Sequence, residues 1–389
     1  MESLPSSNRF RRYPKTTLVV VVLLLILILD VALTGVYHVY KYGTIHKFDH
    51  RRALRVPSDI FHHTLKPNDR HAVEKWGDRS HILSTNSLGF KDRTPRNVPL
   101  ASPNVRLLFL GDSFTEGVGL EYEQTFVGLI DTALQPHNIE VMNAGVASYS
   151  PAIYFKKTEY LLEQVGLKVD HVFVFLDISD IQDEGEDYDI RDNRVIWVGG
   201  GMSGLRDFLF EYTGLLKNLW IACEKISGIV YRAPDTGRTQ KEQALGVNMY
   251  RSLWTLDEKV YEEYGKVGLQ KSGKHMTQLS QLLKRHNVAL TVAVYPWPDQ
   301  VFHRDLDSLQ VQYWQNWAEE NGVRFFNLFP RFIHHDRDPT GDIEHLFIRG
   351  DVHWNQEGHQ FIADEFLSFF RANYSSFKPE AYDTIESHP

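Results

Sequence analysis

The stretch FLGDSFTEG, residues 109–117, is the segment that decides the fold of this 389-residue chain. An apolar run, RLLFLG at 106–111, stops abruptly at Asp112 and Ser113, and small and polar residues follow it. Such a pattern is typical of a buried strand that turns sharply into a helix. Two interpretations of Ser113 follow: a nucleophile at the tip of a strand, or a polar residue that begins the next helix.

Four more apolar runs follow this one, at 139–145, 170–177, 289–296 and 323–329. Helical patterns separate them, and a last amphipathic pattern covers 356–372. Continuous apolar strands alternating with helices indicate a parallel sheet that is covered on both faces. We therefore expect an α/β domain over 101–376 with a doubly wound, mostly parallel five-stranded sheet, and a C-terminal tail at 377–389.

The composition is that of a globular protein, with 42% hydrophobic, 24% charged and 13% aromatic residues. A net charge of −8 without a basic stripe argues against nucleic acid as a partner. Cys223 is the only cysteine, which excludes an intrachain disulfide and a cysteine-based zinc site. We expect no cofactor.

The N-terminus predicts attachment to a membrane. A basic tail at 1–15 precedes an apolar segment at 16–40 in which Asp30 is the only formal charge. A bilayer core needs about 20 apolar residues in a helix, and no small-residue cleavage site follows directly, which favours an uncleaved signal anchor over a removed signal peptide. Basic residues flank both ends, so loop charge leaves the orientation open. Asp30 either snorkels from a shifted span or contacts a partner helix.

Two regions lie outside the regular α/β pattern. Residues 41–100 form a membrane-proximal segment without sustained periodicity. Residues 182–260 form an insertion with an acidic opening, a glycine-rich turn and an apolar helical stretch. The insertion is either a crossover whose helix packs on the body or a lid or docking surface over the site. We favour packing for the helix and leave the acidic loop open.

Polar residues stand at the ends of several predicted strands. Ser113, Gly145 and the stretch 177–180 follow the first three strands, and Asp351 and His353 follow the last one after a loop. The carboxyl ends of parallel strands meet at one edge of the sheet, where ligands bind. There His353 could take the Ser113 proton while Asp351 holds the imidazole. The backbone N–H groups of Ser113 and Gly145 would face a developing oxyanion.

These motifs resemble the blocks of the SGNH (GDSL-type) hydrolases. GDSFTEG is similar to the first block, NAGVASYS to the second and DVHWNQEGH to the last, over roughly residues 80–372. The Asp-x-His-Trp spacing is similar to that of carbohydrate O-acetyltransferases of the alginate type. The upstream TNSLGFKD (85–92) resembles a segment of bacterial, membrane-anchored members.

The resemblance implies a flavodoxin-like SGNH fold with Ser113 as nucleophile, Gly145 as oxyanion donor, and Asp351 and His353 completing the triad. The third block of the family reads Gly-x-Asn-Asp, whereas Ser179 stands here in place of the asparagine. Ser179 is therefore the expected third oxyanion donor. A hydroxyl is a shorter donor, and losing one such donor costs about 10²–10³ in turnover.

Other residues near these motifs are candidates for substrate contact. Asn86 and Asn143 are more typical of loop supports, Tyr149 and Trp354 could stack on sugars although such aromatics usually belong to the core, and Asp112 and Asp180 flank the site. His359 is expected to pack or cap a helix. A metal site from Asp351, His353 and His359 lacks a further ligand cluster, so no metal is expected.

The sequence therefore predicts a single-pass, membrane-anchored serine esterase or O-acyltransferase that acts on acyl esters of carbohydrates. The acetyl group and an extracytoplasmic (periplasmic) location are implied by the resemblance alone. The expected partners are the bilayer, through 16–40, and a multi-spanning acyl-transport protein suggested by Asp30. The alternatives are a non-catalytic SGNH-like domain that binds polysaccharide or scaffolds a membrane complex, and a lipase for long acyl chains.

Overall fold

The computed structural model describes residues 13–42, 54–70, 72–77, 79–198, 213–219, 238–334 and 336–373. These residues belong to two compact units. The larger unit comprises the described residues between 54 and 198 and between 238 and 373. The smaller unit comprises 13–42 and 213–219.

A sheet of five parallel strands forms the centre of the larger unit, in the order β11-β10-β7-β5-β6. The strands are β5 (Val105–Leu110), β6 (Ile139–Asn143), β7 (His171–Leu176), β10 (Ala289–Val294) and β11 (Arg324–Asn327). In the register, Phe109 of β5 lies beside Phe173 of β7. This order is doubly wound, with the switch point between β5 and β7. The predicted five-stranded parallel α/β fold is confirmed.

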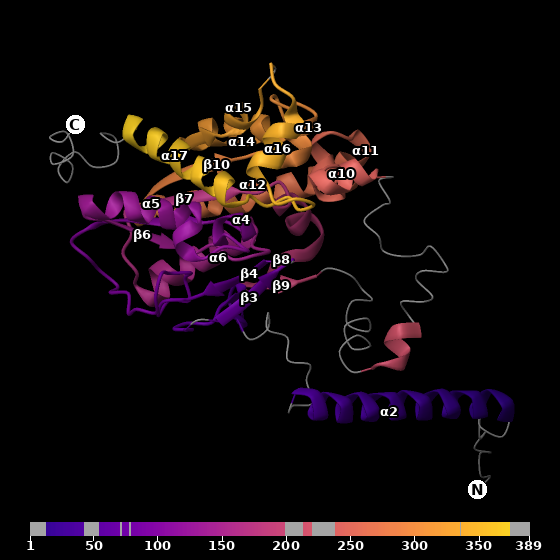
Figure 1. Cartoon of the computed structure of the whole chain (residues 1–389). Helices are drawn as coiled ribbons and strands as arrows, with labels where there is room; N and C mark the ends of the chain where they lie inside the picture. Colours follow the sequence, from indigo (N-terminus) through magenta and orange to yellow (C-terminus); the bar gives the residue numbers. More distant parts are fainter. Residues whose placement is uncertain are drawn as a thin grey trace, which may run out of the picture. The chain divides into compact units, whose positions relative to one another are not determined.

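Helices cover the sheet (Figure 1). α5 (Phe126–Leu134) packs with α17 (Gln356–Ala372), whereas α12 (Lys266–Arg285) packs with α6 (Pro151–Glu159) and α14 (Leu309–Asn321). Right-handed crossovers put α5 and α6 on opposite faces, because the connections through them run in opposite directions along the sheet. Short helices complete the unit: α4 (Ser113–Glu116), α7 (Asp180–Gln182), α10 (Gln240–Leu245), α11 (Glu258–Val260), α13 (Pro298–Phe302), α15 (Phe329–Phe332) and α16 (Pro339–Leu346). The 3-10 and π segments are η1 (Tyr122–Gln124), η2 (Gln135–His137), η3 (Tyr160–Val165), η4 (Asp183–Asp187), η5 (Tyr250–Thr255) and η6 (Tyr261–Gly265).

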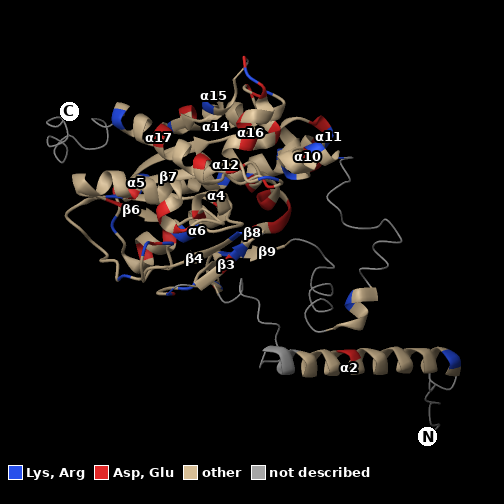
Figure 2. Ribbon diagram, viewed as in Figure 1, with Lys and Arg blue, Asp and Glu red and all other residues tan. Residues whose placement is uncertain are grey.

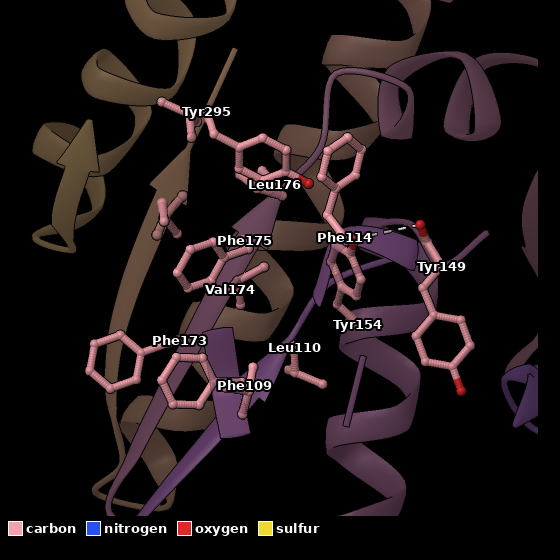
Figure 3. Close-up of a cluster of buried hydrophobic side chains, with 14 of the residues drawn as sticks. Phe109, Leu110, Phe114, Tyr149, Tyr154, Phe173, Val174, Phe175, Leu176 and Tyr295 are labelled. Atoms are coloured by element: carbon pink, nitrogen blue, oxygen red, sulfur yellow. Dashed lines mark hydrogen bonds between the residues drawn. The ribbon is translucent and has the colours of Figure 1, made fainter. Parts of the chain in front are cut away.

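Aromatic side chains fill the layer between the sheet and α17. The rings of Phe109 and Phe173 stack with their centroids 5.2 Å apart, and Phe366 of α17 packs against both of them. Figure 3 shows Phe109, Phe173 and Phe175 along β5 and β7, below the strand ends that carry the candidate site. These fully buried rings hold the strand ends in a fixed position, because interiors are close-packed.

Two antiparallel hairpins lie between residues 54 and 83, where the sequence shows no periodicity. They are β1 (Arg55–Ser58) with β2 (His62–Leu65), and β3 (Ala72–Trp76) with β4 (Arg79–Leu83). Their inward positions include the charged residues Arg55 and Glu74, which form a buried ion pair, and His81 beside them. Buried charges replace the apolar residues that would have produced an alternating pattern, so hydropathy alone did not indicate the strands.

The acidic opening of the insertion begins as η4 and continues into a third hairpin, β8 (Tyr188–Arg191) with β9 (Arg194–Trp197). Its turn residues Asp192 and Asn193 both have positive φ, as a type I′ turn requires. The N–H of Val195 donates to the carbonyl of Ile60 between β1 and β2, so this loop packs on the body. The GGGMSG turn, Cys223 and most of the apolar stretch lie outside the described residues.

The end of the insertion supports the loop that carries Asp351 and His353. The N–H of Gly350 donates to the carbonyl of Ala244, at the end of α10, over 2.8 Å. A Cβ on Gly246 would lie 2.5 Å from the carbonyl oxygen of Asp351, and this glycine has φ +70°. Only glycine fits this close approach.

The smaller unit contains α2 (Pro14–Tyr42), which is long and apolar enough to cross a membrane. A signal sequence would have the same composition. Figure 2 shows that charge is almost absent along this helix. The Asp30 carboxylate accepts backbone N–H groups from Gly214, Leu215 and Leu216 at 2.8–3.0 Å. Among the described residues, Asp30 therefore binds the chain's own insertion, an arrangement that neither sequence-based interpretation included.

Candidate active site

The nucleophile candidate lies at the turn between β5 and α4. Asp112 caps α4 by accepting the N–H of Phe114 at 2.9 Å, and Ser113 is the first residue of the helix. A Cβ on Gly111 would lie 2.0 Å from Thr115 Oγ1, so the turn requires glycine there. Ser113 Oγ lies 2.7 Å from His353 Nε2 and 3.0 Å from Asp112 Oδ2. Ser113 thus begins helix α4 and also lies within hydrogen-bonding distance of the His353 imidazole.

His353 reaches Ser113 from the loop that precedes α17. Its Nδ1 lies 2.6 Å from Asp351 Oδ1, so Nδ1 carries the proton and Nε2 is free to accept one from Ser113. Burial alone would raise the pKa of Asp351. The hydrogen bonds from His353 and Trp76 and the charge of His353 outweigh burial and hold that pKa well below its ordinary value. Asp351 is therefore a carboxylate at neutral pH, as an orienting residue must be.

Trp76 completes this group and was not expected from the sequence. Its Nε1–H donates to Asp351 Oδ2 at 2.9 Å, and its ring meets the His353 ring edge-on at 4.9 Å. The sequence contains one signal for the hairpin that carries Trp76. Gly77 follows Trp76, has φ +61° and lies in the hairpin turn. The hairpin alone would not have indicated a contact with a residue 275 positions away.

The expected oxyanion glycine lies against the nucleophile's helix. A Cβ on Gly145 would lie 2.7 Å from the Thr115 side chain and 2.8 Å from the Glu116 nitrogen. Asn143 supports this contact, because its Nδ2 donates to the Thr115 carbonyl at 2.8 Å while its Oδ1 accepts the Gly145 N–H at 3.1 Å. The Gly145 N–H is thus held by Asn143 in this structure, whereas the Ser113 N–H, at the helix start, has no intrahelical acceptor.

Ser179 does not present its proton as an oxyanion donor in this structure. Its hydroxyl donates to Asp177 Oδ2 at 2.5 Å, and its N–H donates to the same oxygen at 2.9 Å. Asp177 occupies the position of the family's glycine, and that carboxylate attracts the single hydroxyl proton. The role expected for Ser179 requires a rotation away from Asp177.

Three buried carboxyl groups gather behind Ser113: Asp112, Asp177 and Asp180. Burial, followed by the charge of Asp177, raises the pKa of Asp112 well above its ordinary value. Burial and the charges of Asp112 and Asp177 do the same for Asp180. Arg251 of η5 balances part of this charge by binding Asp183 and the Ser179 carbonyl. The raised pKa of Asp112 favours its neutral form and so weakens it as a competitor of His353 for the Ser113 hydroxyl proton, although Ser113 Oγ lies 3.0 Å from Asp112 Oδ2.

These three carboxyl groups are the one cluster among the described residues with metal-ligand spacing. Most of their oxygens already accept protein donors: Phe114 N–H and Ser113 Oγ at Asp112, Trp297 Nε1 and Ser179 at Asp177, and Tyr154 Oη at Asp180. Asp180 Oδ1 has no hydrogen-bond partner.

Four other candidates lie within the protein rather than at a substrate surface. Asn86 is fully buried and binds Asp92 and two backbone N–H groups of its own loop. Tyr149 and Trp354 are both fully buried, which is the core position that is usual for such aromatic residues. His359 Nδ1 accepts the N–H of Phe126 at 3.1 Å, which is a capping role, and burial lowers its pKa to about 3.

The model of the GDSL-like Lipase/Acylhydrolase family matches residues 109–361. No match was found among curated proteins. Among solved structures, the psychrotrophic esterase EstA from Pseudoalteromonas sp. is 12% identical, with 70% of this chain and 100% of that chain covered and a TM-score of 0.37. The acetylxylan esterase Axe2 from Geobacillus stearothermophilus is 15% identical, with 70% and 95% covered and a TM-score of 0.37. Because the family match spans more than half of the sequence, this chain belongs to the GDSL-like lipase/acylhydrolase family.

Proposed function

We propose that this protein is a membrane-anchored serine esterase or O-acyltransferase that acts on acetyl esters of carbohydrates through an acyl-enzyme on Ser113. The observation that carries the proposal is the continuous chain from Ser113 Oγ to His353 Nε2 at 2.7 Å and from His353 Nδ1 to Asp351 Oδ1 at 2.6 Å. A serine needs such a base, and the base needs such an orienting group.

The chemistry proceeds in two half-reactions. Ser113 Oγ attacks the ester carbonyl carbon while His353 Nε2 accepts its proton, and the resulting imidazolium is stabilised by Asp351. His353 then returns the proton to the leaving alkoxide, which leaves the acyl group on Ser113. Water or a sugar hydroxyl then attacks the acyl-enzyme while His353 accepts its proton; the bond between the acyl carbon and Ser113 Oγ breaks, and His353 returns the proton to Ser113 Oγ. Both acceptors use the same residues.

The burial of the site supports a short acyl group. Ser113 is 7% exposed and His353 is 8% exposed, and Phe114 packs between His353 and Trp354. A long acyl chain would need an apolar groove, whereas an acetyl group fits beside a nearly covered serine. A series of p-nitrophenyl esters of increasing chain length tests this, and a preference for long chains would favour a lipase instead.

The experiment that tests the function uses the full chain in mild detergent. Wild type and Ser113→Ala are compared for hydrolysis of p-nitrophenyl acetate and for labelling by a serine-reactive phosphonate. We expect turnover and labelling in the wild type and neither in Ser113→Ala. Equal signals from the two proteins would rule out Ser113 as the nucleophile. Acetylated xylo-oligosaccharides with and without an acceptor sugar then separate transfer from hydrolysis.

The second candidate function is a non-catalytic domain that binds polysaccharide or scaffolds a membrane complex. It is favoured by the Ser179 hydroxyl, which donates to Asp177 rather than into the site, and by the Gly145 N–H, which Asn143 holds. Saturable binding of an acetylated polysaccharide by a wild type that neither turns over esters nor reacts with phosphonate would support this function.

We also propose that α2 anchors the chain with the larger unit outside the cytoplasmic membrane, beside a multi-spanning acyl-transport protein. The length and apolar composition of α2 support an anchor. Asp30, which suggested the partner, already binds the insertion. Recovery of the protein alone after crosslinking in its native membrane and mild extraction would contradict the partner proposal.

A further inference from the structure

The triad carboxylate is bound on both of its oxygens. Asp351 Oδ1 accepts from His353 Nδ1 at 2.6 Å and from the Val352 N–H at 2.6 Å, while Oδ2 accepts from Trp76 Nε1 at 2.9 Å. An indole has one N–H donor that lies in the plane of its ring and cannot rotate separately. Its position therefore fixes the plane in which the Asp351 carboxylate lies.

Trp76 is itself held from two sides. On one side, a Cβ on Gly119, just beyond the nucleophile's helix, would lie at the ordinary van der Waals distance of 3.7 Å from Trp76 Cβ. In the same strand, the buried Glu74 pairs with Arg55, which also binds Glu116 of the nucleophile's helix α4. The strand that carries Trp76 is thus tied to the element that carries Ser113. This link limits how far the strand that carries the Trp76 indole can move relative to the nucleophile's helix.

The contacts of Trp76 favour a role in orientation over direct contact with the reacting atoms. Its N–H is used by Asp351, and its ring meets His353 edge-on at 4.9 Å with an interplanar angle of 79°. Trp76 therefore contacts Asp351 and His353, the two residues that would activate Ser113. It lies on the side of the His353 ring that carries Nδ1. The residue also lies outside the span 109–361 that matches the family model.

We propose that Trp76 is a positioning residue of the triad, whose indole N–H fixes the Asp351 carboxylate so that His353 keeps Nε2 directed at Ser113. This inference rests on the proposed function for its kinetic consequence. Without the indole N–H, the carboxylate is held through Oδ1 alone, by His353 Nδ1 and the N–H groups of Val352 and His353, so it can twist about its Cβ–Cγ bond and orients the imidazole less precisely. Hydrogen bonds to charged groups are the stronger ones, so the loss is expected to be measurable.

The test replaces only the N–H group of the Trp76 indole. Amber suppression at codon 76 of the full chain introduces benzothienylalanine, in which sulfur replaces the N–H, or a fluorinated tryptophan, which keeps the N–H. The two side chains have nearly the same shape, so packing is matched. Trp76→Phe removes the same N–H with a natural amino acid. Trp197→Phe, in the β8–β9 hairpin, is the control for loss of a partly exposed indole elsewhere in the protein. Kinetics on p-nitrophenyl acetate and the exchange rate of the His353 Nδ1–H with solvent, followed by NMR, are measured for each variant.

We expect benzothienylalanine to lower kcat by about ten- to hundredfold with little change in KM, and to speed exchange of the Nδ1–H. The fluorinated tryptophan and Trp197→Phe should match wild type in both measurements. Equal kcat and exchange rate in the benzothienylalanine and fluorotryptophan variants would overturn the proposal. A raised KM with unchanged kcat would overturn it as well, because Trp76 would then be a substrate contact.

Failure of the proposed function has a separate signature. In that case the wild type and the fluorotryptophan variant would neither hydrolyse the ester nor react with phosphonate. The exchange rate of the His353 Nδ1–H still decides the role of Trp76 then, because it depends on the hydrogen bond to Asp351 and not on turnover.

Discussion

Lys157 of α6 is a buried amine that supports the loop carrying Gly145. Its Nζ donates to the Ala144 carbonyl at 3.0 Å and to Tyr149 Oη at 3.1 Å. Burial lowers its pKa to about 7, and Glu116 offsets this only in part. The pKa of a lysine in an unfolded chain is about 10.4, so between these values the unfolded chain binds more protons. Stability should therefore rise with pH across this window, by up to about 1.4 kcal/mol per pH unit.

We predict that Lys157→Met flattens the rise in the free energy of unfolding between about pH 7 and pH 9. Burial also lowers the pKa of Lys91, to about 8, so Lys91 adds a rise of stability with pH in both the wild type and the variant. The difference between the two stability curves therefore reports on Lys157 alone. Urea unfolding at several pH values provides the measurement, and Lys66→Met, at an exposed lysine, is the control. Parallel pH curves for wild type and Lys157→Met would contradict the prediction.

At the scale of residues, the sequence predicted those site residues that a local motif carries. Ser113, Asp351 and His353 stand in short blocks of recognisable order, and the structure brings them within hydrogen-bonding distance. Trp76 was missed because its contact with Asp351 depends on tertiary packing. For Tyr149 and Trp354 the sequence left stacking on sugar and burial in the core both open, and only the packed structure gives their exposure.

At the scale of elements, Arg55 joins the first two hairpins to the nucleophile's helix. It binds Glu74 of β3 at 2.5 Å and Glu116 of α4 at 2.6 Å, and both glutamates are fully buried. Removing one partner leaves buried charges without compensation, which costs about 3–5 kcal/mol. We predict a loss of this size in the free energy of unfolding for Arg55→Met, measured by urea titration.

Two further variants test whether the uncompensated charge causes the loss of stability in Arg55→Met. Combining Arg55→Met with Glu74→Gln and Glu116→Gln should recover much of the loss, since no carboxylate then lacks a counter-ion. Arg191→Met, which breaks an exposed pair with Asp189, should change stability by about 1 kcal/mol or less. Equal losses for Arg55→Met and Arg191→Met would show that burial of the network contributes nothing.

Asp30 gives a second prediction at the scale of elements. A Cβ on Gly214 would lie 3.2 Å from Thr34 Oγ1, so cysteines at positions 34 and 214 are close enough to crosslink once Cys223 is replaced by serine. We expect a disulfide to form in this background and to be lost when Asp30→Leu removes the acceptor of three N–H groups. The single cysteine at 34 is the control, and an undiminished crosslink in Asp30→Leu would contradict the role of the carboxylate.

The elements themselves differ in how well sequence predicts them. All five central strands were found, since strands buried on both faces read as continuous apolar runs. The hairpins were not found, because their inward positions hold an ion network and their outward positions include exposed apolar side chains such as Val73 and Ile82. A pattern of apolar and polar residues does not predict strands whose buried positions hold charged side chains.

At the scale of the whole molecule, the catalytic parts all lie in the larger unit, but they extend beyond the family's matched span. We predict that a chain beginning at residue 50 reacts with phosphonate at the wild-type rate, because it keeps both hairpins. A chain beginning at residue 93 should lose that reactivity along with Arg55, Glu74 and Trp76. Labelling of the two purified proteins compares them directly, and equal labelling would show that the hairpins are dispensable.

The contacts of Asp351 also have a consequence for biosynthesis. Trp76 and Ser113 are separated from their partners by 275 and 240 positions. At a synthesis rate of about 5–20 residues per second, the first hairpins and the nucleophile wait for tens of seconds before the ribosome releases the segment that completes them. During this interval the nascent chain carries a serine without a base. The proposed triad is therefore complete only after the segment with Asp351 and His353 has been made, 240 positions after Ser113 in the case of His353.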